Sequence, residues 1–410
     1  MSVARTEPTP RERMTWINSF AEAHEVLRSS NFVADLHNRH SYPVVGESIL
    51  TLEGDAHLNR RRTELPLFSR PALERYEFEC VVPSIRQAFP AGSREDVAAD
   101  LLRVMQAALL RVSAAVIGLD EVASEDRAQK LRGIALRIGE AASVEWSTRN
   151  VTDIVREALE AKQEFVTAFY GPSRARRKDL VAAWRAGRLS AEDLPLDLIT
   201  TLLETHAEWD DDKLLRECLF YLAASSSTTT NAAPHVFMEL WTWLDNHPED
   251  RVLVGDLSFL QLAVAETLRI HPTVPALIRR ALGGTTLSSG RSIRAGEQLA
   301  IDLKAVNCDP VLFGDSALRF DPHRQLPSRV QPYATAFAAG PHTCLGRRVA
   351  VGSGNGIFDG EDEPVGVLTR LIQELFRRDV SLDPDDPPVL RADTLAERYE
   401  RFPVIVHATR

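Results

Sequence analysis

Cys344 is the residue whose surroundings point most directly to chemistry. The thiol lies in the run FAAGPHTCLG (337–346), where glycines bracket it, His342 precedes it and a helix-forming stretch follows. A thiolate stays ionised when partial positive charge lies nearby, and the unpaired backbone N–H groups of a helix start supply that charge. Gly340 and Gly346 leave room for a flat macrocycle and permit a tight turn. An isolated cysteine is more often a small buried hydrophobe, but these neighbours predict a thiolate ligand to haem iron.

The same run resembles the haem-binding signature of the cytochrome P450 family, Phe-x-x-Gly-x-(His/Arg)-x-Cys-x-Gly. Every fixed position of this short form is met, beginning at Phe337, while Ala338 stands where the family usually has Gly, Ser, Asn or His. The resemblance extends from about Phe20 to about Arg378. It implies that Cys344 binds the iron of haem b.

Four cationic residues stand in the order in which the family binds the haem propionates. Carboxylates call for cationic donors, ideally arginine. The resemblance assigns this role to His57 and Arg61 in GDAHLNRRR, to Arg279 in LIRRAL, and to His342.

The oxygen-activating segment is where the chain departs from the family. The family pattern is Ala/Gly-Gly-x-(Asp/Glu)-Thr-Thr-x-Asn, and the residues here are ASSSTTTN (224–231). The register set by the final asparagine places Ala224 beside the haem and Thr228 at the family's alcohol. Ser225 then stands where a glycine opens the groove for dioxygen, and Ser227 stands where the carboxylate belongs. Thr228, Ser227 and Ser225 are therefore the predicted catalytic residues, without the acid of the family's usual proton route.

A long helix should carry this segment. Residues 211–244 are predicted to form one helix of roughly 50 Å, at about 1.5 Å per residue, kinked at Pro234. Helical patterns also cover 72–89, 98–118, 124–145, 151–169, 174–188 and 194–205, and the alternating stretch 285–299 indicates a hairpin. With the resemblance, these patterns imply a mainly α fold with small β-sheets, in which one haem-thiolate domain (16–410) follows a polar tail (1–15).

Glu266 and Arg269, three residues apart in AETLRIHP, lie on one face of a helix. An exposed pair at this spacing would contribute little. The pair resembles the family's Glu-x-x-Arg motif, and Arg324 in RFDPHR matches its third member. The resemblance gives the three a structural role in building the haem cradle.

Three further departures concern the surroundings of the site. The family's N-terminal helix and first strand are expected to be shortened or lost. The connection from Phe32 to His57 is short, which predicts either an open pocket or a small lid. After the cysteine, residues 352–363 form a Gly-rich and acidic insertion, which lies either where a ferredoxin docks or on a tolerant surface.

Composition narrows the class of protein. The chain has 410 residues, a net charge of −10 and four cysteines without paired spacing, which argues against nucleic acid as partner and against a disulfide or zinc framework. No run of eighteen apolar residues occurs, so we expect no membrane span and a cytoplasmic protein.

The predicted function follows from the resemblance. It implies a haem-thiolate monooxygenase that takes electrons from a ferredoxin and oxidises a small organic molecule in secondary-metabolite biosynthesis, with a carrier-protein-bound substrate as a further possibility. One alternative is an atypical reaction: oxidative coupling, aromatic nitration or peroxide-driven oxidation. Another is a haem-binding sensor or recruitment protein without turnover.

Overall fold

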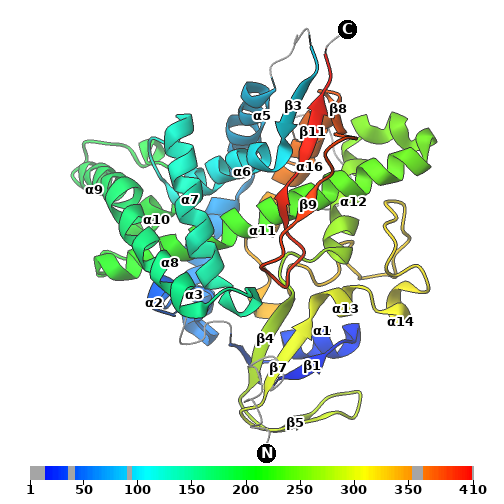
Figure 1. Ribbon diagram of the computed structural model, residues 1–410. Helices are drawn as coiled ribbons and strands as arrows, with labels where there is room; N and C mark the ends of the chain where they lie inside the picture. The colour runs from blue at the N-terminus through cyan, green and yellow to red at the C-terminus, as the bar shows by residue number, and fades with distance from the viewer. Residues whose placement is uncertain (1–13, 36–41, 90–94, 353–362, 409–410) are drawn as a thin grey trace, which may run out of the picture.

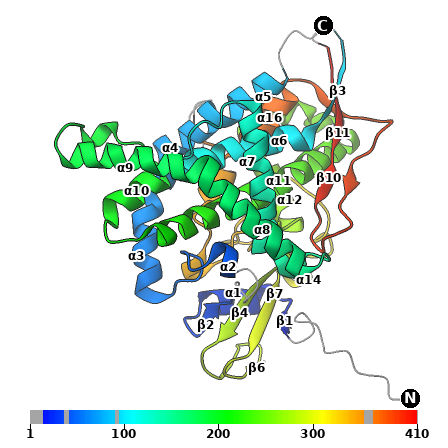
Figure 2. The same cartoon turned by 60° about the vertical axis from the view of Figure 1, so that its left-hand side comes forward.

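The computed structural model describes residues 14–35, 42–89, 95–352 and 363–408. Figures 1 and 2 show a large helical part and a smaller part below it, in which α1 (Phe20–Arg28) packs on a sheet. The predicted architecture, mainly helical with small sheets, is confirmed.

The longer helices match the predicted segments. The helical part comprises α3 (Gly54–Glu64), α4 (Arg70–Arg75), α5 (Val82–Ala88), α6 (Leu101–Ile117), α7 (Glu125–Ala142), α8 (Val151–Phe165), α9 (Gly171–Arg185), α10 (Leu198–Thr205), α11 (Asp211–Asn246), α12 (Leu257–Ile270) and α16 (Val367–Phe376). Shorter turns are α2 (Tyr42–Val45), α13 (Leu303–Asn307), α14 (Pro310–Phe313) and α15 (Arg347–Val351). A π-helical stretch joins α4 to α5, so the predicted helix over 72–89 is nearly continuous.

The helix predicted from residue 98 is wrong at its start. Residues 97–100 form strand β3 (Val97–Asp100), which pairs with β11 (Pro403–Val406). The Asp100 carboxylate accepts a hydrogen bond from the N–H of Leu102 and so caps α6. The pairing partner lies about three hundred residues away, so a local helical pattern could not reveal it.

Four strands form the main sheet in the order β1-β7-β4-β2. They are β1 (Thr15–Ile17), β7 (Gln298–Asp302), β4 (Ala276–Ala281) and β2 (Phe32–Ala34), with β1 parallel to β7 and the other pairs antiparallel. Thr15 pairs with Leu299 and donates a side-chain hydrogen bond to Glu297 (2.5 Å). The predicted tail of 1–15 is therefore one residue too long, and its first thirteen residues lie outside the described part. In the described chain, β1 is an edge strand.

Smaller strand pairs complete the fold. The predicted hairpin within 285–299 is present as β5 (Thr285–Thr286) and β6 (Ser292–Ile293). Near the C-terminus, β8 (Val380–Leu382) joins β11, and β9 (Val389–Leu390) pairs with β10 (Tyr399–Arg401). The segment between β9 and β10 returns to the helical part, where it reaches α7 and α11.

Helix α11 crosses the centre of the helical part in Figure 1. Its 36 residues run as one helix from the Asp210 cap, as predicted, and include Pro234. Proline has no N–H, so the carbonyl of Thr230 loses its helical partner there. The helix contacts α2, α6, α7, α12 and α16, which makes it the element around which the other helices are arranged.

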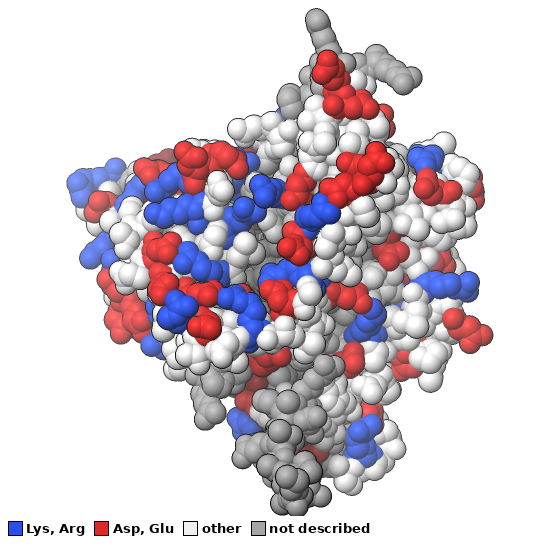
Figure 3. Space-filling model, in the orientation of Figure 1, with Lys and Arg blue, Asp and Glu red and all other residues white. Residues whose placement is uncertain are grey.

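Acidic and basic side chains are interspersed on the face shown in Figure 3. On α8 and beside it, Arg149 pairs with Glu140 and Glu157, and Arg156 pairs with Glu160. These contacts are largely solvated, so they solubilise the helices more than they stabilise them.

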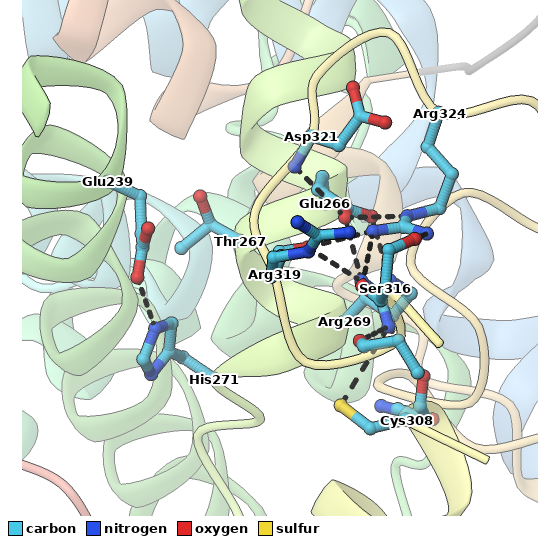
Figure 4. Close-up of polar contacts among 12 residues, drawn as sticks. Glu239, Glu266, Thr267, Arg269, His271, Cys308, Ser316, Arg319, Asp321 and Arg324 are labelled. Carbon is cyan, nitrogen blue, oxygen red and sulfur yellow. Dashed lines mark hydrogen bonds and ion pairs between the residues drawn. The ribbon is translucent and has the colours of Figure 1, made fainter. Parts of the chain in front are cut away.

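Buried charges, in contrast, tie α12 to the loop that precedes the cysteine run (Figure 4). Arg269 is fully buried and makes two 2.7 Å hydrogen bonds to the Glu266 carboxylate. Arg324 donates to the same carboxylate at 2.8 Å. Further donors of Arg269 reach the carbonyl groups of Asn307 and Ala317. The predicted triad therefore exists, and it joins the helix to two points of the following loop.

Removing Glu266 should destabilise the protein. A Glu266→Ala variant leaves two buried guanidinium groups without their shared carboxylate, which typically costs about 3–5 kcal/mol. We expect a correspondingly lower free energy of unfolding, measured by denaturant titration, and a low yield of soluble protein. Glu160→Ala is the matched control, because this exposed carboxylate should change stability by less than about 0.5 kcal/mol. Equal stability of the two variants would contradict the structural role of the triad.

Candidate functional site

A cavity of about 400 Å³ lies between α11 and the cysteine run. Its walls are mostly apolar and come from α6, α7, α11, β4 and the loop before α15. Apolar residues that line it include Phe68, Leu109, Val112, Val116, Phe220, Val274 and Leu277. The predicted site residues that line it are His57, Arg61, Ala224, Ser225, Ser227, Thr228, Phe337, His342, Cys344 and Gly346. Only Arg279 and Gly340, among the predicted set, do not.

The Cys344 thiol faces this cavity. Its side chain is exposed, yet it is surrounded by protein, so its free surface belongs to the cavity wall. The N–H of Cys344 donates to the carbonyl of Phe337 (3.0 Å), which closes the loop around the sulfur. Burial raises the pKa of the thiol, while the N–H groups of Gly346 and Arg347 and the charge of Arg61 oppose this rise. The thiol is thus directed into the cavity with donors and a cation ready to hold a thiolate.

Glycine is needed at positions 340 and 346 of the run for different structural reasons. Gly340 has φ +71°, and a Cβ atom there would lie 2.4 Å from the carbonyl oxygen of Leu27 at the end of α1. Gly346 has a negative φ, and a Cβ atom would come within 3.8 Å of the Cys344 sulfur alone. Gly340 therefore permits the loop to pack on α1, and Gly346 keeps the cavity open beside the thiol.

A cluster of cationic side chains lies at one end of the cavity. His57 stacks on His342 with ring centroids 4.1 Å apart. Arg61 donates to the carbonyl of Thr343 (2.8 Å). Arg279 is buried, and its only hydrogen bond in the described chain is to the carbonyl of its neighbour Ile278.

This cluster carries more positive charge than its protein partners balance. Burial lowers the pKa of Arg279 to about 10. Burial, together with the charges of His342 and Arg61, lowers the pKa of His57 to about 4. The Glu53 carboxylate, 3.1 Å from His342, acts on both histidines and on Arg279, and Glu64 acts on Arg61. Buried cations normally have anionic partners, so the cluster fits two carboxylates such as the haem propionates.

The hydroxyl run on α11 is bonded to its own helix. Ser225, Ser227 and Thr228 donate to the carbonyl groups four residues earlier, at 2.6, 2.8 and 2.8 Å. Each hydroxyl proton is thereby engaged, while the oxygen can still accept a hydrogen bond from a molecule in the cavity.

Comparison with known proteins decides the family. The cytochrome P450 model matches residues 9–352 of the chain. This protein belongs to the cytochrome P450 family. The family implies a haem-iron cofactor, and its curated relatives are monooxygenases, so this P450 is an enzyme of that type.

The relatives of this P450 are distant. Cyclooctat-9-en-7-ol 5-monooxygenase of Streptomyces melanosporofaciens is 28% identical over 340 residues, covering 75% of this chain and 70% of that protein. Cytochrome P450 monooxygenase 205 of Postia placenta is 24% identical over 401 residues, covering 79% and 73%.

Solved structures share the fold of this P450. The crystal structure of CalO2 has a TM-score of 0.72 at 19% identity, with 98% of this chain and 94% of that chain covered. The structure of P450BioI, in complex with an acyl carrier protein ligated to hexadec-9Z-enoic acid, has a TM-score of 0.70 at 20% identity, with 96% and 92% covered. No helix in the described part of this P450 is long and apolar enough to cross a membrane.

The cover over the cavity is a small one. Val44 and Val45 of α2 are buried, and α2 packs on α7, α8 and α11. Ile49 and Leu50, just beyond it, line the cavity. Of the two expectations for this connection, the described residues fit the small lid.

The helix that follows Cys344 is interrupted, as the sequence predicted. α15 ends at Val351, and α16 begins at Val367. The backbones of Gly352 and Gly366 touch, since a Cβ atom on Gly366 would lie 2.5 Å from the nitrogen of Gly352. Most of the predicted insertion, 353–362, lies outside the described residues, but the chain leaves and returns at one point.

Buried side chains hold this junction. Gln261 donates to the carbonyl groups of Val351 and Val365, at 3.0 and 2.9 Å. The buried Glu77 carboxylate accepts hydrogen bonds from the N–H groups of Val365 and Gly366. Sequence reasoning missed Glu77 because its partners lie almost three hundred residues away.

A buried pair of acids on α3 and α11 was also missed. Tyr221, which lines the cavity, donates to Glu64 at 2.7 Å, and Glu217 pairs with Arg60. Burial and the charge of Glu217 raise the pKa of Glu64 well above its usual range. The Glu64 carboxyl therefore lies one hydrogen bond from the cavity wall.

The segment between β9 and β10 is fixed by a histidine network. His271, at the end of α12, lies 2.7 Å from Glu239 (Figure 4). Its other ring nitrogen lies 2.9 Å from the carboxylate of Glu397. Burial opposes protonation of His271, but its hydrogen bonds to both carboxylates prevail and raise its pKa. The hydrogen bond to His271 and contacts with Lys304 lower the pKa of Glu397 to about 2. The charged network therefore holds Glu397 beside the end of α12 and, through Glu239, beside α11.

The stability that this network contributes should depend on pH. Because its folded pKa is raised, His271 stabilises the fold fully below its unfolded pKa of about 6.5 and loses that contribution as pH rises through the folded value. Glu397, whose folded pKa is depressed, contributes above its unfolded pKa of about 4.3 and loses it as pH falls toward about 2. In His271→Gln we expect the loss of thermal stability to be largest near pH 5–6 and smaller above pH 8, roughly on this basis.

The control is His247→Gln, because His247 is partly exposed, stacks on Trp243 and lies 3.5 Å from a single acid, the exposed Glu249. This variant should change Tm little at any of these pH values. A His271→Gln loss that is the same at pH 5.5 and pH 8.5 would show that His271 acts by packing alone.

Proposed function

We propose that this P450 binds haem b through Cys344 and oxidises a small organic molecule in the cavity below α11. The observation that carries the proposal is the Cys344 thiol, which faces the cavity and lies near the cation cluster, whose Arg61 donates to the carbonyl of the adjacent Thr343. The bound haem would supply dioxygen activation, with the thiolate donating electron density that favours O–O cleavage. The test is the spectrum of the reduced carbon monoxide complex.

The cavity residues have distinct roles in this proposal. Arg61 and Arg279 would hold the propionates, with His57 and His342 completing the cationic end. Phe337, Gly346 and Ala224 would bound the macrocycle, while Gly340 supports the loop from behind through its contact with α1.

Proton supply would pass through hydroxyl groups. Ser227 does not titrate near neutral pH, so it can relay a proton through water but cannot recharge as a carboxylate can. Thr228 and Ser225, which line the same cavity wall, would hold such a water through their free lone pairs. The substrate itself is an alternative donor.

Electrons would come from a ferredoxin in the cytoplasm, and the product would belong to secondary metabolism. The similarity to CalO2 and P450BioI supports only the fold that these assignments presuppose. One observation favours a second candidate: the absence of a carboxylate from 224–231 suits oxidative coupling, nitration or peroxide-driven oxidation, which do not all need that acid.

Replacing the thiol should abolish the thiolate signature. Cys344→Ser is expected to lose the long-wavelength band of the reduced carbon monoxide complex, because a hydroxyl is a poor anionic ligand to iron. Cys218→Ser is the control, since Cys218 is fully buried in the core and its pKa is raised by burial. Loss of the band in the control, or its survival in Cys344→Ser, would overturn the assignment.

Changing the hydroxyl run should change coupling. We expect Thr228→Ala to lower the ratio of product formed to reductant consumed, because it removes a lone pair that would order water. Ser227→Asp should alter the ratio of product to released peroxide, because it restores a titratable group. Product, reductant and peroxide are measured for wild type and both variants. If neither ratio moves, the second candidate becomes the better account.

A further inference from the structure

Arg398 is a partly buried cation with no hydrogen-bond or ion-pair partner in the described chain. It lies just before β10, and its side chain lines both the main cavity and a second cavity of about 60 Å³. In the described chain its guanidinium donates no hydrogen bond, and its Nε is buried and unsatisfied. The buried Arg269, in contrast, donates hydrogen bonds to Glu266 and to the carbonyl group of Asn307. A buried donor without an acceptor is costly, so the Nε of Arg398 points to a ligand.

The carboxylates near Arg398 are already engaged. Glu140 accepts hydrogen bonds from Arg149 (2.7 Å) and Ser147 (3.0 Å). Asp393 accepts two from Arg391, at 2.8 and 2.7 Å. Burial and the charge of Arg391 lower the pKa of Arg398, against the opposing effect of these two acids. The site therefore keeps a surplus of positive charge.

The second cavity has the composition of an anion site. Its charged lining residues are three arginines, Arg132, Arg391 and Arg398, and one acid, Glu140. The partner of Arg132 there is the neutral amide of Gln106 (3.0 Å). A volume of about 60 Å³ exceeds what one water needs by a few times, so a carboxylate group fits.

Two small residues join this site to the main cavity. Gly139 of α7 and Ser227 of α11 line both cavities, as Arg398 does. A Cβ atom on Gly139 would approach the Ser227 side chain to 3.5 Å. The position that carries an acid in the family pattern thus holds a short neutral side chain, which leaves the guanidinium of Arg398 without an internal carboxylate at the junction.

The backbone around Arg398 is fixed in place. Glu397 is held by His271 and by Lys304 (2.5 Å). Tyr399 packs against the ring of His235, with centroids 4.9 Å apart. Because both neighbours are anchored, the backbone that carries Arg398 needs little ordering on binding.

We propose that Arg398 binds a carboxylate of the substrate, so that this P450 takes an apolar acid. The carboxylate would lie at the junction of the two cavities, and the apolar body would fill the main cavity. This inference rests on the proposed function, which places the haem on the Cys344 side of the same cavity. The guanidinium of Arg398 identifies the substrate class, because a guanidinium can donate two parallel hydrogen bonds to the two oxygens of a carboxylate.

The test compares acids with their methyl esters. Haem-loaded wild type is titrated calorimetrically with decanoic acid, 5-phenylpentanoic acid and both methyl esters. We expect at least one acid to bind about tenfold more tightly than its ester or better, the usual effect of a charge-assisted hydrogen bond. If no acid binds more tightly than its ester, the proposal is overturned. Displacement of ligand by inorganic phosphate without an acid preference would also overturn it, because Arg398 would then be a site for a phosphate group.

Variants assign the preference to Arg398. Arg398→Gln should remove the difference between acid and ester, and Arg398→Lys should keep part of it. Ser227→Asp should weaken acid binding and spare the ester, because it offers Arg398 an internal partner. Arg401→Gln is the matched control, since Arg401 lies on the same hairpin and pairs with Asp386 at the surface. An acid preference that survives Arg398→Gln would contradict the proposal.

The spectrum separates this proposal from the function on which it rests. Haem content and the reduced carbon monoxide band are measured for every variant. A normal band with equal acid and ester affinities defeats the Arg398 proposal alone. Absence of the band from wild type defeats the proposed function instead.

Discussion

The buried carboxylate of Glu266 is the contact on which the geometry of the site depends. It binds Arg269 from its own helix and Arg324 from the loop that leads toward Cys344. Arg269 also donates to the carbonyl groups of Asn307, at the end of α13, and Ala317, in the loop. A long irregular loop has little regular hydrogen bonding of its own to fix its course. The fully satisfied arginine supplies that constraint, and α12, which carries it, packs directly on α11. The positions of the thiol and of the hydroxyl run are therefore both fixed relative to α11 and α12.

Two kinds of buried charge occur in this P450, and their difference marks where ligands belong. Arg269, Glu77 and Arg177 have close partners of opposite charge inside the protein. Arg279, which is buried, and Arg398, whose side chain is partly buried with a buried Nε, have none in the described chain. Because burying an unpaired charge opposes folding, the second kind is retained only where something outside the chain completes the pair. By this criterion an anionic group should bind at two places in the cavity. One is the cation cluster, and the other is the junction with the second cavity.

The sequence predicted the features whose signals are local. The run around Cys344, the length of α11 and the Glu266–Arg269 spacing each depend on neighbouring residues, and the structure has the helix and the ion pair where the sequence predicted them. The strand β3 was mistaken for helix because its partner β11 lies at the other end of the chain. Arg398, Glu77 and Glu64 were missed for the same reason, since a charged residue in a sequence carries no sign of whether folding will bury it.

The backbones of Gly352 and Gly366 touch. The segment between them can therefore change in length without moving the catalytic centre. A loop whose two ends touch can be lengthened at a small entropic cost that grows only logarithmically, and Gln261 and Glu77 hold those ends independently of what lies between them. The junction is thus a suitable site for inserting other sequences. A reporter, an affinity tag or a fused electron-transfer domain could be spliced there, close to the cysteine loop in the chain, without displacing the thiol.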